Sequence, residues 1–320
     1  MRGTVVGVLR GGPSSEHDVS LATGQAILKH LSPEHFTTRD IYIDKEGVWH
    51  ERGLPTTPQR VLPQVDAVIL ALHGEYGEDG TIQRLLELHG IPYTGSDSFA
   101  SRIAMHKVLT KEKAREAGLL TPRYHYVEEG ADIAEAAAHI VRTMHQPVIV
   151  KPVALGSSVG ISLVGGYAPV FQAISALTQH GGVLVEEVIK GREATVGVVE
   201  GLRGERLYRL PAIEIIPPEQ AVFFDKNSKY NGQSQEIVPG RFSKVESEEL
   251  LRQAALMHDV LGLRHYSRSD FIVSPKGIYF LETNTLPGLT SESLLPKALQ
   301  SVGVSFSDFL SHLVHLSLQK

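Results

Sequence analysis

The sequence predicts a protein of mixed α/β and α+β class built from three units, the first of which is an open parallel β-sheet. Strand-like and helix-like runs alternate over the first hundred residues, as is typical of a parallel sheet with crossover helices. Glycine-rich loops follow several of the strand-like runs. Beyond about residue 100 the strands and helices follow an α+β pattern. Apolar residues make up 42% of the 320 residues, which is enough for each unit to bury its own core.

The first unit, residues 1–103, has three candidate strands. They span residues 4–9, 37–43 and 65–72. A helix is predicted to begin at Ser15, because Ser15 and Asp18 have the spacing of a capping box. Glu16 and His73 follow the first and third strands, and ligands of such sheets gather at the carboxyl ends of the strands. Both residues could instead be ordinary helix caps.

The second and third units, residues 104–186 and 187–320, have the α+β pattern. A long helical stretch at 98–118 leads into the second unit, which continues with a helix at 132–144 and strands at 148–151, 161–164 and 183–189. The third unit has strands at 194–200 and 206–215, a helix at 246–262, a hairpin at 265–284 and closing helices. Its loop 217–241 is too long and too aromatic for a plain connector. We expect this loop to be a lid that excludes water, or else an Ω-loop packed on its own aromatic residues.

Composition excludes several classes of function. The formal net charge is −5, so the chain lacks the basic excess that binds nucleic acid or anionic lipid. The absence of cysteine excludes disulfides, thiolate nucleophiles and iron–sulfur clusters. No apolar run approaches the ~18 residues of a membrane span, and the apolar stretch at 4–9 is too short for a secretion signal. We therefore expect a cytoplasmic protein.

The hairpin at 265–284 is the strongest local candidate for a site. A three-residue turn at 275–277 would place Asp270 opposite Glu282 and Arg268 opposite Asn284, with all four side chains on one face. Two carboxylates and an amide oxygen suit Mg²⁺, and a cation between them removes their mutual repulsion. A cross-strand ladder of salt bridges is the alternative. The opposite face, expected to be core, carries Phe271, Val273, Tyr279 and Leu281.

A second candidate site begins where Lys151 ends an apolar strand. The following loop, 156–160 (GSSVG), could close its backbone N–H groups over phosphate oxygens, although it is not a Walker A motif. It could also be an ordinary turn beside an exposed lysine. The same loop satisfies G-x-S-x-G, so a serine hydrolase with Ser158 as nucleophile is a further alternative. That motif requires a helix directly after the turn, whereas residues 161–164 look like a strand.

Several other charged residues are candidates for binding a nucleoside triphosphate, because its phosphates require several cations. Lys107 lies on a helical stretch, and Lys229 and Tyr230 lie in the loop 217–241. Alone, Lys107 would be a solvated surface residue. A run of acidic residues between the second and third units could hold a base and a ribose, or could form hinge salt bridges; its members are Glu186, Glu187 and Glu193.

Together these segments resemble the ATP-grasp ligases and, within them, the D-alanine–D-alanine ligase family. The resemblance covers nearly the whole chain. The matching segments are 11–21 (GGPSSEHDVSL), 73–80 (HGEYGEDG), 92–96 (PYTGS), Lys151-Pro152 with 156–161 (GSSVGI), 191–193 (GRE), Lys229-Tyr230, 268–270 (RSD), 282–290 (ETNTLPGLT) and Ser293-Leu294. Small departures occur at Ser267, Ser269 and Thr283, none of which is a ligand position.

The resemblance implies a three-domain ATP-grasp architecture and assigns roles to individual residues. Phosphates would be bound by Lys107, Lys151, Lys229 and the loop serine Ser158. The adenine would lie by the backbone of 186–189, which includes Glu186, Glu187 and Ile189, and the ribose by Glu193. Two Mg²⁺ or Mn²⁺ ions would be held by Asp270, Glu282 and Asn284. The first D-alanine would be bound by Glu16, linked to Ser157 and Tyr230, and the remaining substrate contacts would come from His73, Arg268, Gly288, Ser293 and Leu294.

The implied reaction joins two D-alanines into D-alanyl-D-alanine for peptidoglycan precursor synthesis. ATP first converts one carboxylate into an acyl phosphate, and Arg268 with the Gly288 N–H would stabilise the oxyanion formed when the second amine attacks. Tyr230 favours D-alanine as the acceptor over D-lactate, although D-lactate and D-serine ligases are related alternatives. An ATP-binding regulator without turnover is a further alternative. The resemblance also implies a homodimer through the first unit.

Overall fold

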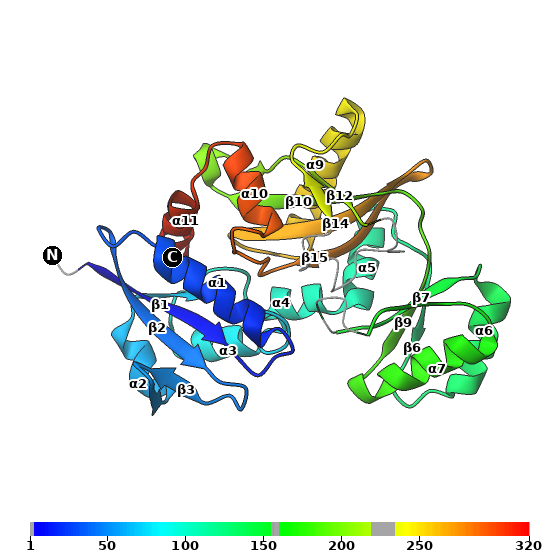
Figure 1. Ribbon diagram of the computed structural model, residues 1–320, viewed down its shortest axis with the longest axis horizontal. Coiled ribbons are helices and arrows are strands. Elements are labelled where there is room, and N and C mark those ends of the chain that lie inside the picture. Colours follow the sequence, from blue (N-terminus) through cyan, green and yellow to red (C-terminus); the bar gives the residue numbers. More distant parts are fainter. Residues whose placement is uncertain (1–2, 155, 157–159, 219–233, 320) are drawn as a thin grey trace.

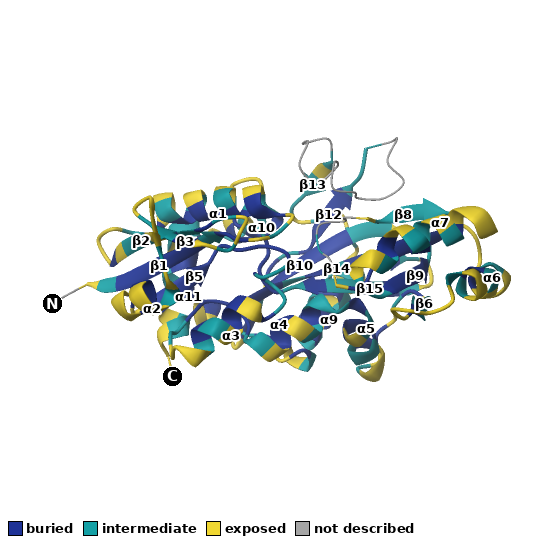
Figure 2. Cartoon of the chain, turned by 90° about the horizontal axis from the view of Figure 1, so that it is seen from below, coloured by how far each residue is buried: buried dark blue, intermediate teal, exposed yellow. Residues whose placement is uncertain are grey.

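Three β-sheets follow one another along the chain (Figure 1). The computed structural model describes residues 3–154, 156, 160–218 and 234–319. Each sheet has its own covering helices, and buried residues concentrate where sheets and helices meet (Figure 2). The division of the chain into units 1–103, 104–186 and 187–320 stays a prediction.

The first sheet is the open parallel sheet that the sequence predicts, extended at one edge. Its strand order is β4-β3-β2-β1-β5, and β1 pairs in parallel with both β2 and β5. The strands are β1 (Thr4–Gly11), β2 (Phe36–Ile43), β3 (Trp49–Glu51), β4 (Leu54–Thr56) and β5 (Ala67–Leu70). The helices are α1 (His17–His30), α2 (Pro58–Val61), α3 (Thr81–Leu88) and α4 (Ser98–Met105), with a 3₁₀ turn η1 (Leu62–Gln64). The antiparallel β3 and β4 were not predicted.

The predicted start of the first helix is wrong. Helix α1 begins at His17, and its N-cap Glu16 makes no capping side-chain hydrogen bond. Ser15 instead donates its hydroxyl to Glu75 at 3.5 Å, and Ser14 donates to the same carboxylate at 3.2 Å. The serines therefore connect the first loop to the loop after β5.

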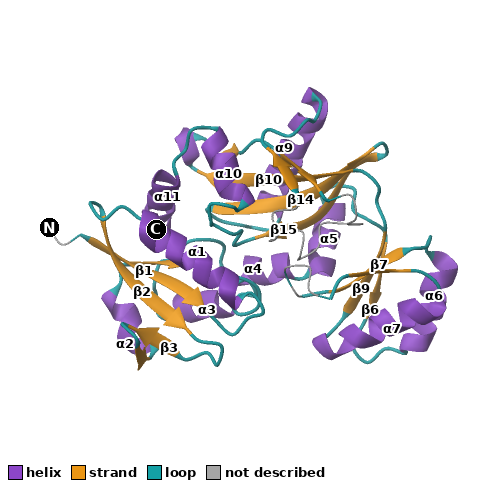
Figure 3. Cartoon of the chain, viewed as in Figure 1, coloured by secondary structure: helices purple, strands orange, loops and turns teal. Residues whose placement is uncertain are grey.

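The second sheet is antiparallel and has the order β6-β9-β7-β8. Its strands are β6 (Tyr124–Val127), β7 (Val148–Pro152), β8 (Ser162–Val164) and β9 (Val183–Glu187). Helices α6 (Ile133–Thr143) and α7 (Tyr167–Leu177), followed by the 3₁₀ turn η2 (Thr178–His180), pack together over it (Figure 3). A separate apolar core, which includes Val150, Val185 and Ile174, lies between these helices and the sheet.

The third sheet follows the order β13-β12-β10-β14-β15, with β11 paired to β10. Its strands are β10 (Arg192–Glu200), β11 (Leu207–Arg209), β12 (Ile213–Ile216), β13 (Gln235–Ile237), β14 (Tyr266–Ser274) and β15 (Gly277–Asn284). The helices are α9 (Lys244–Val260), α10 (Leu294–Ser301) and α11 (Phe306–Leu318), with a 3₁₀ turn η3 (Leu202–Gly204). The predicted strand at 206–215 is in fact two strands, β11 and β12.

The helical stretch predicted at 98–118 is broken at His106. Helix α4 ends at Met105, and α5 (Lys107–Glu116) starts anew with His106 as its N-cap, whose side chain accepts a hydrogen bond from the N–H of Leu109 at 3.3 Å. Helix α5 packs on β15 and α9. The break therefore directs α5 against the third sheet.

The hairpin of β14 and β15 has the predicted register at its open end. Asp270 pairs with Glu282, and Arg268 with Asn284. The predicted three-residue turn is wrong: Ser274 pairs with Gly277, so the loop has two residues, and a bulge between Asp270 and Phe271 restores the register. As a result Phe280 and Ile278, rather than Leu281 and Tyr279, join Phe271 and Val273 in the core.

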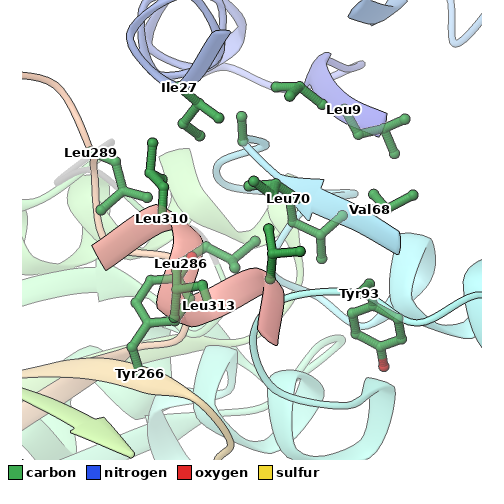
Figure 4. Packing of buried hydrophobic residues seen from close by; sticks show 14 of the residues in the cluster. Leu9, Ile27, Val68, Leu70, Tyr93, Tyr266, Leu286, Leu289, Leu310 and Leu313 are labelled. Carbon is green, nitrogen blue, oxygen red and sulfur yellow. The ribbon is translucent and has the colours of Figure 1, made fainter. Parts of the chain in front are cut away.

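One apolar core joins the two ends of the chain. Leu310 and Leu313 of α11 pack with Ile27 of α1 and Leu70 of β5, and Leu286 from the segment after β15 lies in the same cluster (Figure 4). The C-terminal helix thus completes the core of the first sheet, and it ties the end of the hairpin to the loops after β1 and β5.

We expect Leu310→Ala to lower the free energy of unfolding by about 2–5 kcal/mol, because it leaves a cavity in this core. Urea unfolding followed by circular dichroism measures the change. Leu318→Ala, at a side chain that is 36% exposed on the same helix, is the control and should cost under about 1 kcal/mol. Equal losses in both variants would show that α11 is not part of the core.

Candidate active site

A buried carboxylate bound by two lysines lies at the centre of the candidate site. Glu186 of β9 is 2% exposed, and its two oxygens lie 2.6 Å from the Nζ of Lys111 and 2.6 Å from the Nζ of Lys151. Lys111 comes from α5 and Lys151 from β7. The three residues therefore connect the second sheet with the helix that packs on the third.

The charges of this triad are set by burial and by mutual attraction. Burial alone would raise the pKa of Glu186, but the ammonium groups of Lys111 and Lys151 outweigh it and hold the pKa below its usual value. Burial lowers the pKa of Lys111 to about 8, against the attraction of Glu186. With two ammonium groups on one carboxylate, the triad carries one net positive charge. That excess suits an anionic ligand.

The hairpin face carries the predicted oxygen-rich patch. Arg268 donates two hydrogen bonds of 3.1 Å to the carboxylate of Asp270, and Asn284 donates one of 3.3 Å. Across the register pair, Glu282 lies 3.8 Å from the Nζ of Lys107 on α5. The predicted metal ligands and one predicted phosphate-binding lysine are therefore in one place.

The donor set of this patch fits a hard divalent cation. Asp270 and Glu282 are directly opposed carboxylates, and Asn284 adds an amide oxygen, the ligand types that Mg²⁺ and Mn²⁺ take. No cluster of three or more His, Cys, Asp or Glu side chains with metal-ligand proximity occurs among the described residues. A cation held here would thus need further oxygen ligands from a second bound molecule or from water.

The loops that follow β1, β5 and β7 meet at Glu16. The carboxylate oxygen Oε2 of Glu16 lies so close to Gly74 and Gly156 that a Cβ at either glycine would approach it to 2.9 Å. A side chain at either position would displace the carboxylate. The first loop and the glycine loop are thus brought together, as predicted from their positions after strands, and Gly156 of the small-residue loop lies beside them.

His73 is a neutral, buried ring in this group of loops. Its Nδ1 lies 3.0 Å from the carbonyl oxygen of Leu286 and its Nε2 lies 2.8 Å from Oγ1 of Thr23. Burial lowers the pKa of His73 to about 4. A carbonyl only accepts, so Nδ1–H is the donor to Leu286 and Nε2 accepts from the threonine. The ring therefore fixes the segment after β15 against the first unit.

Glu78 is a second carboxyl group in the same place, and it was not predicted. Its Oε1 accepts a hydrogen bond of 3.0 Å from the N–H of Gly74, and its side chain is 13% exposed. Burial, followed by repulsion from Glu16, raises the pKa of Glu78 to about 8, while Arg268 acts in the opposite direction. Glu78 therefore keeps its proton at neutral pH, where a glutamate is ordinarily ionised.

The segment after the hairpin brings Gly288 and Ser293 together. A Cβ at Gly288 would lie 2.9 Å from Oγ of Ser293. That hydroxyl accepts a hydrogen bond of 3.1 Å from the N–H of Thr290, and Ser293 is the N-cap of α10. Leu294, the first residue of α10, is buried in the core that joins the chain ends.

The remaining acidic residues lie at the junction of the second and third sheets. Glu187 accepts a hydrogen bond of 2.8 Å from the N–H of Arg123, which fixes its carboxylate beside β6. Ile189 is partly exposed in the connection to β10, and Glu193 pairs with Ile272 within the third sheet. The backbone of this connection thus runs beside the triad of Glu186.

Four predicted site residues lie outside the described residues: Ser157, Ser158, Lys229 and Tyr230. The serine-hydrolase alternative can still be tested by its context. Residues Ser162–Val164 form strand β8, and α7 begins only at Tyr167. A nucleophile elbow requires a helix directly after the turn, so this context does not support Ser158 as a hydrolase nucleophile.

Sequence reasoning also missed Lys111 and Thr195. Lys111 is four residues after Lys107, and this spacing places both lysines on one face of α5, so it could have been found. Thr195 donates a hydrogen bond of 2.5 Å to Oδ1 of Asp270 from the neighbouring strand β10. Only the pairing of β10 with β14 reveals that contact, because the two residues are 75 positions apart in the sequence.

Among the described residues, no helix is both long and apolar enough to cross a membrane.

We expect Glu78→Gln to weaken the pH dependence of stability. With a pKa of about 8, Glu78 keeps its proton in the folded chain when the unfolded chain has lost it, so stability falls as the pH rises from about 5 to 8. The Gln side chain cannot titrate. The free energy of unfolding of the variant should therefore fall by about 2–4 kcal/mol less than that of the parent chain over this pH range, at about 1.36 kcal/mol per pKa unit.

Urea unfolding at pH 5 and at pH 8 measures that difference. Glu75→Gln, in the same loop, is the control. The assignment of a retained proton to Glu78 fails if both variants follow the pH dependence of the parent chain.

Comparisons with known proteins agree with this geometry. Residues 5–58 and 50–96 match the family described as D-ala D-ala ligase N-terminus, and residues 114–315 match D-ala D-ala ligase C-terminus. The D-alanine–D-alanine ligase of Pelobacter propionicus is 38% identical over 318 residues, 98% of this chain and 96% of the relative. That of Geobacter sulfurreducens is 38% identical over 98% of this chain and 94% of its own length.

Solved structures are similar over the whole fold. The D-alanine–D-alanine ligase of Bacillus anthracis complexed with ATP has a TM-score of 0.83 and 29% identity, covering 99% of this chain and 98% of its own. The VanG D-Ala:D-Ser ligase of Enterococcus faecalis has a TM-score of 0.84 and 29% identity, covering 99% and 100%. The predicted ATP-grasp architecture is confirmed, and the chain belongs to the D-alanine–D-alanine ligase family.

Proposed function

We propose that this chain uses ATP to join two D-alanines into D-alanyl-D-alanine for peptidoglycan synthesis. One observation carries the proposal: the hairpin pairs Asp270 with Glu282 and Arg268 with Asn284, and Lys107 lies 3.8 Å from Glu282. Acidic metal ligands beside buried lysines suit transfer of a phosphoryl group, in which both reactants are anionic. The family of the chain supports the same activity.

The nucleotide is proposed to lie between the second and third sheets. Lys107 and Lys151 would bind its phosphates together with Lys229 and Ser158. In support, Lys107 of α5 lies 3.8 Å from Glu282 of the hairpin, and Lys151 of β7 lies 2.6 Å from Glu186. The backbone from Glu186 through Glu187 to Ile189 would hold the adenine, and Glu193 the ribose.

Two divalent cations, Mg²⁺ or Mn²⁺, are proposed to be held by Asp270, Glu282 and Asn284. When bound, such ions neutralise the charge that develops on the transferred phosphoryl group. Thr195 and Arg268 fix one carboxylate of this set by hydrogen bonds, so its oxygens are oriented before a ligand arrives. Positioning of this kind accounts for much of the catalysis of phosphoryl transfer.

The amino acids are proposed to lie where the first unit meets the segment after the hairpin. Glu16 would bind the ammonium group of the first D-alanine, linked to Ser157 and Tyr230. Gly74 and Gly156 have no side chain to displace this carboxylate, since a Cβ at either would lie 2.9 Å from its Oε2. Arg268 and the N–H of Gly288 would stabilise the oxyanion of the tetrahedral intermediate. Gly288, Ser293 and Leu294 would frame the second D-alanine, and His73 would be a further substrate contact.

The acceptor and the assembly belong to the same proposal. Tyr230 favours D-alanine over D-lactate, while the similarity to a D-Ala:D-Ser ligase keeps D-serine as an alternative acceptor. We propose a homodimer through the first unit, where Leu88 and Phe99 are exposed apolar side chains. The cytoplasm, which supplies ATP and free D-alanine, is the proposed compartment.

We expect purified protein with ATP, Mg²⁺ and D-alanine to release inorganic phosphate and form D-alanyl-D-alanine, detected by a coupled phosphate assay and by mass spectrometry. L-Alanine should give no release. D-Serine and D-lactate as added acceptors show whether a mixed product forms. Silence with D-alanine and with both other acceptors would refute the proposed activity.

Glu282→Gln should lower turnover at least about tenfold and raise the Mg²⁺ concentration needed for half-maximal rate, because it removes one charged oxygen ligand. The measurement is the initial rate against Mg²⁺ concentration. Glu248→Gln, at an exposed carboxylate of α9, is the matched control and should behave as the parent chain. An unchanged Mg²⁺ dependence in Glu282→Gln would remove the hairpin from the metal site.

A further inference from the structure

Lys111 is a fully buried cation that no predicted role uses. Its side chain is 0% exposed. The Nζ lies 2.6 Å from Oε1 of Glu186 and donates a hydrogen bond of 2.6 Å to Oγ1 of Thr121. It also lies 5.8 Å from the centre of the Tyr124 ring. A charge buried this deeply is tolerated only where its partners are fixed, so the surroundings of Lys111 are built for an ammonium group.

Glu186 binds two lysines, and the two are not equivalent. Lys151 is proposed to bind phosphate, yet its Nζ lies 2.6 Å from Oε2 of Glu186 in this structure. To reach a phosphate, Lys151 has to leave the carboxylate. If it were the only partner, its departure would leave a carboxylate that is 2% exposed without a cation, which is strongly unfavourable.

Lys111 is held in a way that Lys151 is not. Three elements fix its ammonium group: β9 through Glu186, the segment before β6 through Thr121, and β6 itself through Tyr124. Its own helix, α5, packs on β15 and α9 of the third sheet. Lys107, one turn earlier on the same helix, extends instead towards Glu282 of the hairpin. The helix thus presents one lysine to the phosphate region and keeps the other against Glu186.

We propose that Lys111 is a positioning residue that keeps Glu186 ionised and in place, so that Lys151 can move from this carboxylate to the phosphate groups of ATP. The proposal deepens the proposed function, because it rests on binding of ATP at that site. The charge balance supports it: two lysines and one glutamate leave one positive charge for the nucleotide, and removal of Lys111 would leave none.

The first test is Lys111→Met, which keeps an unbranched side chain only one atom shorter and removes the charge. Lys151 should then stay with Glu186. We expect the Kd for a non-hydrolysable ATP analogue, measured by calorimetry, to rise about tenfold, and the KM for ATP to rise with it. The KM for D-alanine should stay unchanged. Lys113→Met, at an exposed lysine of the same helix, is the control and should match the parent chain.

The second test removes the carboxylate as well. In Lys111→Met/Glu186→Gln no negative charge holds Lys151, so we expect the double variant to bind the ATP analogue more tightly than Lys111→Met alone. A purely structural Lys111 would give a double variant as weak as the single one or weaker. That result, or an unchanged Kd in Lys111→Met, would overturn the proposal.

Thr121→Val covers the case in which Lys111→Met does not fold. It removes one of the partners that hold the ammonium group while the ion pair remains, so the Kd for the analogue should rise in the same direction but less. An unchanged Kd in folded Thr121→Val would then overturn the proposal. A parent chain that binds no ATP analogue would instead refute the proposed function, which keeps the two failures distinct.

Discussion

The ion pairs around Glu186 are the interaction on which the arrangement of the site depends. They join β7 and β9 of the second sheet to α5, which packs on the third sheet. Buried charges of this kind contribute little net stability, because desolvation offsets most of their attraction. Their value lies in geometry, since the cations are fixed where the two sheets meet. A nucleotide between the sheets would therefore enter a region that already has a positive excess.

A bulge in the hairpin sets which face its acidic and apolar side chains occupy. In a regular two-residue hairpin the faces would alternate without interruption, and Glu282 would then share the core face with Phe280. The bulge after Asp270 shifts this phase by one residue. Phe271 and Phe280 can thus pack in the core while Asp270 and Glu282 share the other face. Bulges are frequent beside active sites for this reason, as they re-aim a side chain without loss of the sheet.

How far the sequence predicts this molecule depends on whether the signal is local or distant. Three features follow from local patterns. Alternation predicts the parallel strands of the first sheet, spacing predicts the register of Asp270 with Glu282, and position after strands predicts that Glu16 lies near the glycine loop that begins at His73. The bulge was missed because its effect on register equals that of a three-residue turn. The start of α1 was missed because Ser15 hydrogen-bonds Glu75, sixty residues away. Contacts of that kind have no local pattern, and Thr195 with Asp270 is another.

The proposed amino-acid site needs the two ends of the chain to lie close together. The side chain of Leu286 packs in the apolar core with α11, and its backbone carbonyl accepts a hydrogen bond from His73. This one residue therefore joins the core to the ring of His73. A neutral ring is required for this bond pattern, because an imidazolium could not accept from Thr23. The low pKa of His73 is therefore part of the architecture: burial keeps the ring neutral, and the neutral ring holds the segment that leads to Gly288 against the loop that carries Glu78. The proposed substrate contacts from both ends of the sequence are thus positioned by the same apolar core.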